Sequence, residues 1–108
     1  MMKISRVDIL TLKFWLDDNQ AMVIDVREPD EYKEGHIKGA VNIPLSRILT
    51  EIDHIDGYRD KKIVMQCKVG VRSMVACQNL KKDGFKYSVW NLDGGIYAWQ
   101  KAGFHISV

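Results

Sequence analysis

The feature that most constrains this sequence is an apolar, β-branched segment that stops at a cysteine and passes into a short loop. Residues 63–66 read Ile-Val-Met-Gln, Cys67 follows them, and the loop contains Gly70 before a helical pattern from Met74 to Lys82. This order predicts a buried strand, a tight turn and a helix. Ligands bind at the carboxyl ends of the strands in open parallel sheets, so the sequence predicts a site at Cys67.

The rest of the chain alternates between strand-like and helix-like segments. Strands are expected over 21–26, 40–43, 63–66 and 87–92, with a short edge strand at 3–5, and helices over 7–16, 29–34, 46–52, 74–82 and 96–101. This alternation predicts βαβ units with right-handed crossovers. We therefore expect one domain spanning 1–108, an α/β/α sandwich of three layers around a mainly parallel sheet of four or five strands.

Local signals indicate where some helices begin. Ser5 with Asp8 matches a capping box ahead of the first helix, and Ser46 is expected to cap the third. Pro29 suits the first turn of the second helix, because its missing N–H has no partner to lose there. The polar segment 53–62 is expected to form a loop.

Composition limits the classes of partner. The chain has 108 residues, 46% of them hydrophobic, and a net charge of +2, which suits a globular protein and argues against nucleic acid. No apolar run reaches the roughly 18 residues of a membrane span, so no membrane partner is expected. The N-terminus lacks the apolar core of a signal peptide, and two cysteines without one favour free thiols in the cytoplasm. The oligomeric state stays open.

The two cysteines receive different interpretations. Backbone N–H groups of a tight loop, the start of the next helix and the cations Lys68 and Arg72 all favour ionisation of a thiol at Cys67. A buried structural cysteine is the alternative, and the loop argues against it. Cys77 lies three residues from both Met74 and Leu80, so it is expected to fill the core.

Three blocks of sequence resemble a known family. Residues 25–29 (Asp-Val-Arg-Glu-Pro) with 31–32 and 35–44 resemble the N-terminal signature of rhodanese-like domains. Residues 67–73 resemble their active loop, and 92–99 resemble their closing Gly-Gly…Trp motif. The resemblance implies a sulfurtransferase that passes sulfane sulfur through a cysteine persulfide.

The resemblance also implies the chemistry and the partners. Cys67 is the expected nucleophile; it takes the outer sulfur of a small anionic donor such as thiosulfate, or of a persulfide. Cyanide, a thiol or the cysteine of another protein then accepts that sulfur. No cofactor is implied. No metal is expected, because His36, His54 and His105 are scattered without ligand spacing to the cysteines.

The active loop implied by the resemblance comprises Cys67 and the residues after it, which are Lys68, Val69, Gly70, Val71, Arg72 and Ser73. Glycine tolerates positive φ, so Gly70 lets the loop turn back towards the cysteine. Arg72 is expected to pair with an anionic donor or to brace the loop. Ser73 is expected to cap the next helix or to donate a hydrogen bond inside the loop.

Two features qualify these expectations. After the cysteine the family often has Arg or Gln followed by Ser, whereas this chain has Lys68 and Val69. Val71 also replaces a residue that is frequently polar in the family. The mouth of the site is therefore expected to be more apolar, and the preferred sulfur donor stays open.

Asp25 lies at the same sheet edge as Cys67. It either helps to position the loop or a proton, or caps a helix or pairs with Arg27.

Three further functions remain as alternatives. The fold could serve a sulfur carrier that does not turn over thiosulfate, or a redox-sensing module, because a thiol of low pKa oxidises readily. Cysteine phosphatases and arsenate reductases resemble this design, but their Cys-x5-Arg loop is one residue longer than the six residues from Cys67 to Arg72. They also often place a histidine where this chain has Gln66.

Overall fold

A single parallel sheet organises the molecule, whose computed structural model describes residues 3–54 and 60–108. The strands are β1 (Ser5–Val7), β2 (Ala21–Asp25), β3 (Val41–Asn42), β4 (Lys62–Gln66) and β5 (Val89–Leu92). Their order is β1-β5-β4-β2-β3, and every neighbouring pair is parallel. The predicted α/β fold is therefore confirmed, with β4 at the centre.

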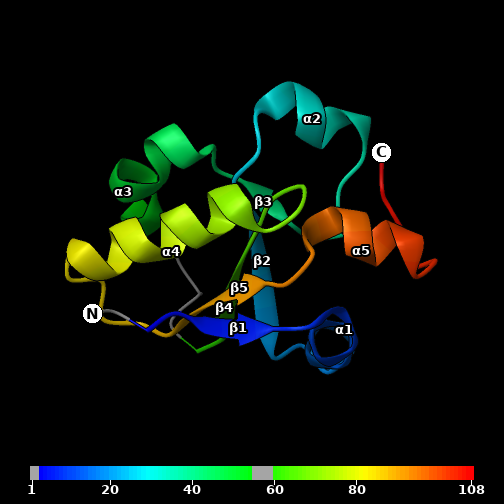
Figure 1. Ribbon diagram of the computed structural model, residues 1–108, viewed down its shortest axis with the longest axis horizontal. Coiled ribbons are helices and arrows are strands. Elements are labelled where there is room, and N and C mark those ends of the chain that lie inside the picture. The colour runs from blue at the N-terminus through cyan, green and yellow to red at the C-terminus, as the bar shows by residue number, and fades with distance from the viewer. Residues whose placement is uncertain (1–2, 55–59) are drawn as a thin grey trace.

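Helices cover both faces of the sheet (Figure 1). The α-helices are α1 (Ile9–Asp17), α2 (Pro29–Glu34), α3 (Ile48–Glu51), α4 (Val71–Lys82) and α5 (Gly95–Lys101), with short 3₁₀ helices η1 (Leu45–Arg47) and η2 (Ile52–His54). Helices α1 and α5 pack on one face, α3 and α4 on the other, and α2 lies beyond the carboxyl end of β2. In the described parts of the chain, no helix has the length and apolarity to cross a membrane.

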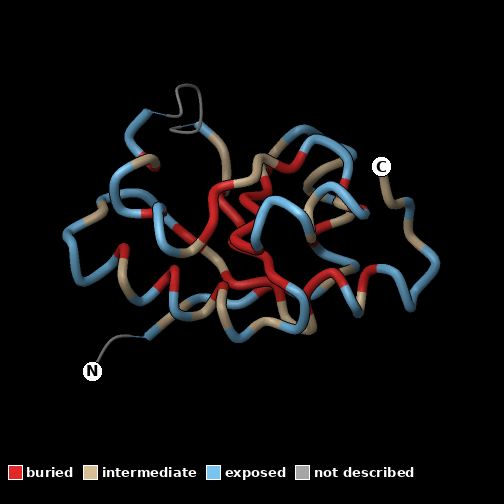
Figure 2. The backbone as a smooth tube through the Cα atoms, turned by 90° about the horizontal axis from the view of Figure 1, so that it is seen from above, coloured by how far each residue is buried: buried red, intermediate tan, exposed pale blue. Residues whose placement is uncertain are grey.

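Burial on both faces explains the apolar run of the central strand. Ile63 and Met65 belong to the core beneath α3 and α4, whereas Val64 belongs to the core beneath α1 and α5. A strand covered on both sides needs apolar side chains at consecutive positions, so alternation is lost. Figure 2 shows the resulting band of buried backbone through the middle of the molecule.

The first helix begins differently from the prediction. Ser5 lies in β1, not in a cap, and the N-cap is Asp8, whose carboxylate accepts the Thr11 N–H at 2.8 Å. Pairing explains the change, because the backbone from Ser5 to Val7 is extended to match β5, with Val7 opposite Leu92. The predicted role of Ser5 in a capping box is therefore wrong.

The segment after β3 also departs from expectation. Ser46 lies inside η1 and caps nothing; η1 starts after Pro44, with the Arg47 N–H donating to the Pro44 carbonyl at 2.8 Å, and α3 follows directly. The edge strand lies at Ser5–Val7 instead of 3–5, and three other strands, β2, β3 and β5, are shorter than predicted. Part of the predicted loop 53–62 belongs to η2 and β4, and residues 55–59 of it lie outside the described residues. Pro29 begins α2 as predicted.

Candidate active site

Cys67 stands at the carboxyl end of the central strand, where the sequence places it. Its side chain is buried. Helix α4 begins at Val71 instead of the predicted Met74, so the loop after Cys67 is shorter than predicted. Gly70 makes this possible: it caps α4 in the left-handed region, with φ 105°, and turns the chain from strand to helix within a few residues.

Hydrogen-bond donors surround the sulfur. The Gly70 N–H donates to Sγ at 3.1 Å, and the Ser73 hydroxyl lies 3.3 Å from Sγ. Burial is the largest influence on the pKa of Cys67 and raises it. The Ser73 hydroxyl and the N–H groups of Ser73, Gly70 and Val69 together outweigh burial and bring the pKa below its ordinary value. The site therefore favours a reactive thiolate that is shielded from water.

This arrangement predicts how alkylation of Cys67 depends on pH. Because only the thiolate reacts, alkylation should continue at pH values below the ordinary pKa of cysteine. Ser73→Ala removes one donor, so we expect the pKa of Cys67 to rise and the midpoint of the rate profile to move to higher pH. The measurement is the rate of iodoacetamide labelling from about pH 5 to about pH 10, in a Cys77→Ala background. An unchanged midpoint in Ser73→Ala would show that the hydroxyl does not stabilise the thiolate.

Asn91 is a site residue that sequence reasoning missed. It is buried in β5, its amide oxygen accepts the Ser73 hydroxyl proton, and its amide N–H donates to the Gly70 carbonyl at 3.1 Å. The Ser73 hydroxyl has only one proton to donate. When Cys67 is a neutral thiol, its S–H donates to Ser73 Oγ, and the Ser73 hydroxyl donates to Asn91. When Cys67 is a thiolate, the Ser73 hydroxyl donates to the sulfur instead. The sequence signal was an asparagine inside an otherwise apolar strand.

Helix α5 holds the loop from the other side. The Ile96 N–H donates to the Cys67 carbonyl at 2.9 Å, and the Tyr97 N–H donates to the Lys68 carbonyl at 3.0 Å. A Cβ on Gly95, whose φ is 59°, would lie 2.5 Å from the Cys67 oxygen and 2.4 Å from the Lys68 oxygen. The predicted Gly94-Gly95 turn is therefore also a point of backbone contact with the active loop.

Arg72 braces the loop against α2. Its Nη1 and Nη2 donate to the two carboxylate oxygens of Glu31 at 2.7 and 3.0 Å, so both partners face each other in a bidentate pair. The hydrogen bond from Arg72 is the main reason that the pKa of Glu31 falls to about 2. Arg72 was expected either to pair with an anionic donor or to brace the loop, and this contact shows the bracing role. The sequence analysis did not identify its partner Glu31, which lies 41 residues earlier in the chain.

The pair predicts a dependence of stability on pH. Because the folded protein lowers the pKa of Glu31 to about 2, its contribution is complete above the ordinary pKa of glutamate and disappears as the pH falls towards 2. Glu31→Gln should lower the free energy of unfolding by about 0.5–1 kcal/mol at neutral pH, the size of a partly exposed pair. Urea unfolding at a series of pH values measures this. Glu34→Gln on the same helix is the control, and a deficit in Glu31→Gln that persists at the acid end would contradict the assignment.

Asp25 and Arg27 form a buried ion pair beneath α2. Arg27 Nη2 lies 2.7 Å from Asp25 Oδ2 and also donates to the Gly35 carbonyl at 2.8 Å. The backbone N–H of Arg27 donates to Asp25 Oδ1 at 3.0 Å. Of the roles considered for Asp25, the pair with Arg27 is present, and Arg27 also holds the Gly35 carbonyl at the end of the helix that carries Glu31.

The active loop itself exposes two valines and one lysine. Val69 and Val71 are 53% and 67% exposed, and Val75 on α4 adjoins them at 37%. Lys68 is also exposed. The remaining candidates from the sequence, Gly70 and Ser73, contact Sγ itself.

The second cysteine and the acidic residues offer no further reactive centre in the described residues. Cys77 is free and fully buried in the core, and burial raises its pKa to about 12. Within 3–54 and 60–108, His, Cys, Asp and Glu do not gather in groups of three that could hold a metal ion. The arrangement around Cys67 is thus suited to nucleophilic chemistry by a thiolate held among N–H donors.

Comparison with known families agrees with this geometry. The family model of the rhodanese-like domain matches residues 10–102. The chain belongs to the rhodanese-like family. The match includes Cys67, Gly70, Ser73 and Asn91, as well as the Glu31–Arg72 pair.

Other proteins with the same rhodanese-like domain span a range of similarity. YtwF of Bacillus subtilis, which its name describes as a candidate sulfurtransferase, is 37% identical over 100 residues, 92% of this chain and 93% of its own length. YqhL of the same organism, uncharacterized, is 44% identical over 80 residues, and the match covers 74% of this chain and 61% of YqhL. A rhodanese-related protein of Thermoplasma volcanium has a structure that superposes with a TM-score of 0.83 at 29% identity, covering 95% of this chain and 97% of that one.

Proposed function

We propose that this rhodanese-like domain is a sulfurtransferase that carries sulfane sulfur as a persulfide on Cys67. The observation that carries the proposal is the environment of Sγ, which receives the Gly70 N–H and faces the Ser73 hydroxyl at the carboxyl end of β4. The candidate sulfurtransferase YtwF, which matches over nearly its full length, supports the same chemistry.

The reaction proceeds in two transfers. The Cys67 thiolate attacks the outer sulfur of the donor; a Cys67–sulfur bond forms, the donor's bond to that sulfur breaks, and the electron pair leaves with sulfite or with a thiolate. An acceptor thiolate or cyanide then attacks the terminal sulfur, yielding a persulfide or thiocyanate and regenerating the Cys67 thiolate. Because the two substrates bind in turn, ping-pong kinetics are expected.

Backbone dipoles stabilise the anionic persulfide without a metal. The N–H groups of Val69, Gly70 and Ser73 already act on the Cys67 sulfur and lower its pKa, and α4 begins beside it with its electropositive end. Donors fixed in this way require no rearrangement when the negative charge moves to the outer sulfur.

The charges around the mouth favour a persulfide donor over thiosulfate. Arg72 is paired with Glu31 and Arg27 with Asp25, so both guanidinium groups are already neutralised. Lys68 is the remaining cation of the active loop, and Val69 and Val71 form its exposed apolar part. A dianion gains little on such a surface, whereas an organic or protein-borne persulfide can cover the valines.

The experiment that tests the proposal is intact mass spectrometry of the reduced protein. Incubation with thiosulfate, and separately with an organic persulfide, should add one sulfur, about 32 Da, that cyanide or dithiothreitol removes. The gain should be faster with the persulfide and absent in Cys67→Ser. A protein that gains no sulfur from either donor is not a sulfurtransferase, and phosphatase and arsenate assays would then be the next measurements.

A sulfur carrier is the second candidate, favoured by the same exposed valines. A carrier forms the identical persulfide but exchanges it with a partner protein instead of turning over small donors. Fast persulfide exchange together with slow thiosulfate-to-cyanide turnover would identify a carrier, and comparable rates would identify a general enzyme.

A further inference from the structure

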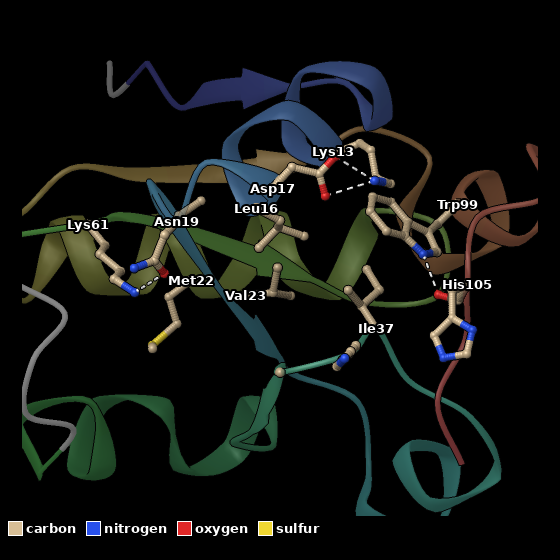
Figure 3. Close-up of a pocket in the computed structure, with 13 residues that line it drawn as sticks. Lys13, Leu16, Asp17, Asn19, Met22, Val23, Ile37, Lys61, Trp99 and His105 are labelled. Atoms are coloured by element: carbon tan, nitrogen blue, oxygen red, sulfur yellow. Dashed lines mark hydrogen bonds and ion pairs between the residues drawn. The ribbon is translucent and has the colours of Figure 1, made fainter.

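The hollow beside the first half of β2 is a poor candidate for a binding site (Figure 3). Three of the side chains that line it, Val23, Ile37 and Trp99, are only 2%, 1% and 3% exposed. They leave a ligand almost no apolar surface to cover.

A cavity of about 340 Å³ at the active loop differs in this respect, because much of its lining is exposed and polar. It lies between α2 and α5, which flank the loop (Figure 1). Its volume is near the lower end of the range for small-molecule sites, about 300–1,000 Å³. The exposed lining residues are Glu34 of α2, Lys68 of the loop, and Tyr97 and Gln100 of α5.

The cavity adjoins the residues that surround the reactive sulfur. Lys68 directly follows Cys67, and its carbonyl accepts the Tyr97 N–H at 3.0 Å, so the active loop and α5 meet at this wall. On the α2 side, Glu31 accepts Arg72 Nη1 at 2.7 Å. That hydrogen bond is the main reason that the pKa of Arg72 is raised, and the negative charge of the Cys67 thiolate adds to the effect. The cavity therefore belongs to the surroundings of the active loop and not to a remote face.

Two opposite charges in this cavity have no partner of their own. Arg27 and Glu31 also line it, but each is already neutralised in one of the two ion pairs of the site. Within residues 3–54 and 60–108, neither Glu34 nor Lys68 forms an ion pair, with the other or with any further residue. One carboxylate on α2 and one ammonium group on the loop therefore remain available to a ligand.

We propose that this cavity binds the acceptor of the sulfur, and that the acceptor is an α-amino-acid thiol of the size of cysteine. The inference rests on the proposed sulfur transfer by Cys67. The carboxylate of the acceptor pairs with Lys68 and its ammonium group pairs with Glu34, so a single zwitterion complements both charges. Val69 and Val71, whose apolar surface favours the donor, do not line this cavity.

The transfer is the second half of the proposed reaction. The acceptor thiolate attacks the outer sulfur of the Cys67 persulfide, and a bond forms between these two sulfurs. The sulfur–sulfur bond to Cys67 breaks, and its electron pair returns to Cys67 as the thiolate, which the Gly70 N–H receives again. The product is the persulfide of the amino acid, and the step consumes no oxidant or reductant.

The test measures how fast four thiols discharge the Cys67 persulfide. They are cysteine, cysteamine (which lacks the carboxylate), 3-mercaptopropionate (which lacks the ammonium group) and uncharged 2-mercaptoethanol. The protein is loaded with an organic persulfide and freed of the excess, and the loss of about 32 Da is followed by intact mass spectrometry at thiol concentrations below saturation. For each thiol the rate in a variant is divided by the rate in the unaltered protein, so the intrinsic reactivity of the thiol cancels.

Each charge should act only on the thiols that carry its counterpart. Glu34→Gln should slow discharge by cysteine and by cysteamine about two- to fivefold, as expected for an exposed ion pair, and leave the other two thiols unchanged. Lys68→Gln should slow cysteine and 3-mercaptopropionate by a similar factor and leave cysteamine and 2-mercaptoethanol unchanged. The matched controls, Asp30→Asn and Lys82→Gln, remove exposed charges outside the cavity and should leave all four rates unchanged.

The proposal is overturned if either cavity variant affects all four thiols equally, if neither slows cysteine, or if the control variants have the same effects. A protein that loads with sulfur but shows one of these results remains a sulfurtransferase whose acceptor is bound elsewhere. A protein that never gains the sulfur refutes the sulfurtransferase function itself, and this inference with it.

Discussion

Replacement of Cys67 by serine is expected to bring sulfur transfer down to the uncatalysed background while the fold stays in place. A serine hydroxyl is far less acidic than this thiol and forms no persulfide, so both transfers lose their nucleophile. Loss of a nucleophile costs covalent enzymes about 10³-fold to about 10⁶-fold in rate. The smaller oxygen can still accept the Gly70 N–H that now reaches Sγ at 3.1 Å, so folding should be little affected.

The chain supplies a matched control for that experiment in its other cysteine. Cys77 is also fully buried, but it lies on the core-facing side of α4 and not in the loop. Cys77→Ala should lower the free energy of unfolding by about 1–2 kcal/mol through lost packing and leave the activity of each folded molecule unchanged. Persulfide formation in Cys67→Ser, or an equal loss of activity in Cys77→Ala, would contradict the assignment of the nucleophile.

The second large effect is expected from Gly95→Ala. The new methyl group would lie 2.4 and 2.5 Å from the carbonyl oxygens of Lys68 and Cys67, and φ of 59° adds backbone strain. Relief requires α5 to move away from the loop, which breaks the hydrogen bonds of Ile96 and Tyr97. We expect the free energy of unfolding to fall by about 2–4 kcal/mol and sulfur transfer to fall with the displaced loop.

Gly103→Ala separates the steric clash from the backbone strain. Gly103 has a similar φ of 85° after α5, but a Cβ there would have no atom within 4 Å. Gly103→Ala should therefore lower the free energy of unfolding by about 1 kcal/mol and leave the activity unchanged. Urea unfolding and the rate of Cys67 alkylation in both variants measure the difference; equal losses would show that the contact of Gly95 with the loop does not constrain the site.

The placement of Cys67 was predictable because it depends on local pattern. An apolar run that ends at a cysteine, with Gly70 shortly after it, indicates a buried strand and a tight turn without knowledge of any neighbour. The Asp25–Arg27 pair was open to the same reasoning, since the two residues are two positions apart.

The rest of the site depends on strand order and helix docking. Asn91 reaches Ser73 only because β5 lies beside β4, and Glu31 reaches Arg72 only because α2 rests at the carboxyl edge. The error at Ser5 has the same origin: its capping tendency gives way to pairing with β5. Contacts across the fold decide these positions, and a single sequence does not display them.

The contacts between α5 and the loop have a consequence for the direction of each peptide unit. A trans peptide is planar, and its C=O and N–H point in opposite directions. When Ile96 and Tyr97 donate to the carbonyls of Cys67 and Lys68, the N–H groups of Lys68 and Val69 must point away from α5, and the N–H of Val69 acts on the Cys67 sulfur. Helix α5, through these two hydrogen bonds, therefore helps to orient the backbone donors on which the affinity of this site for negative charge depends.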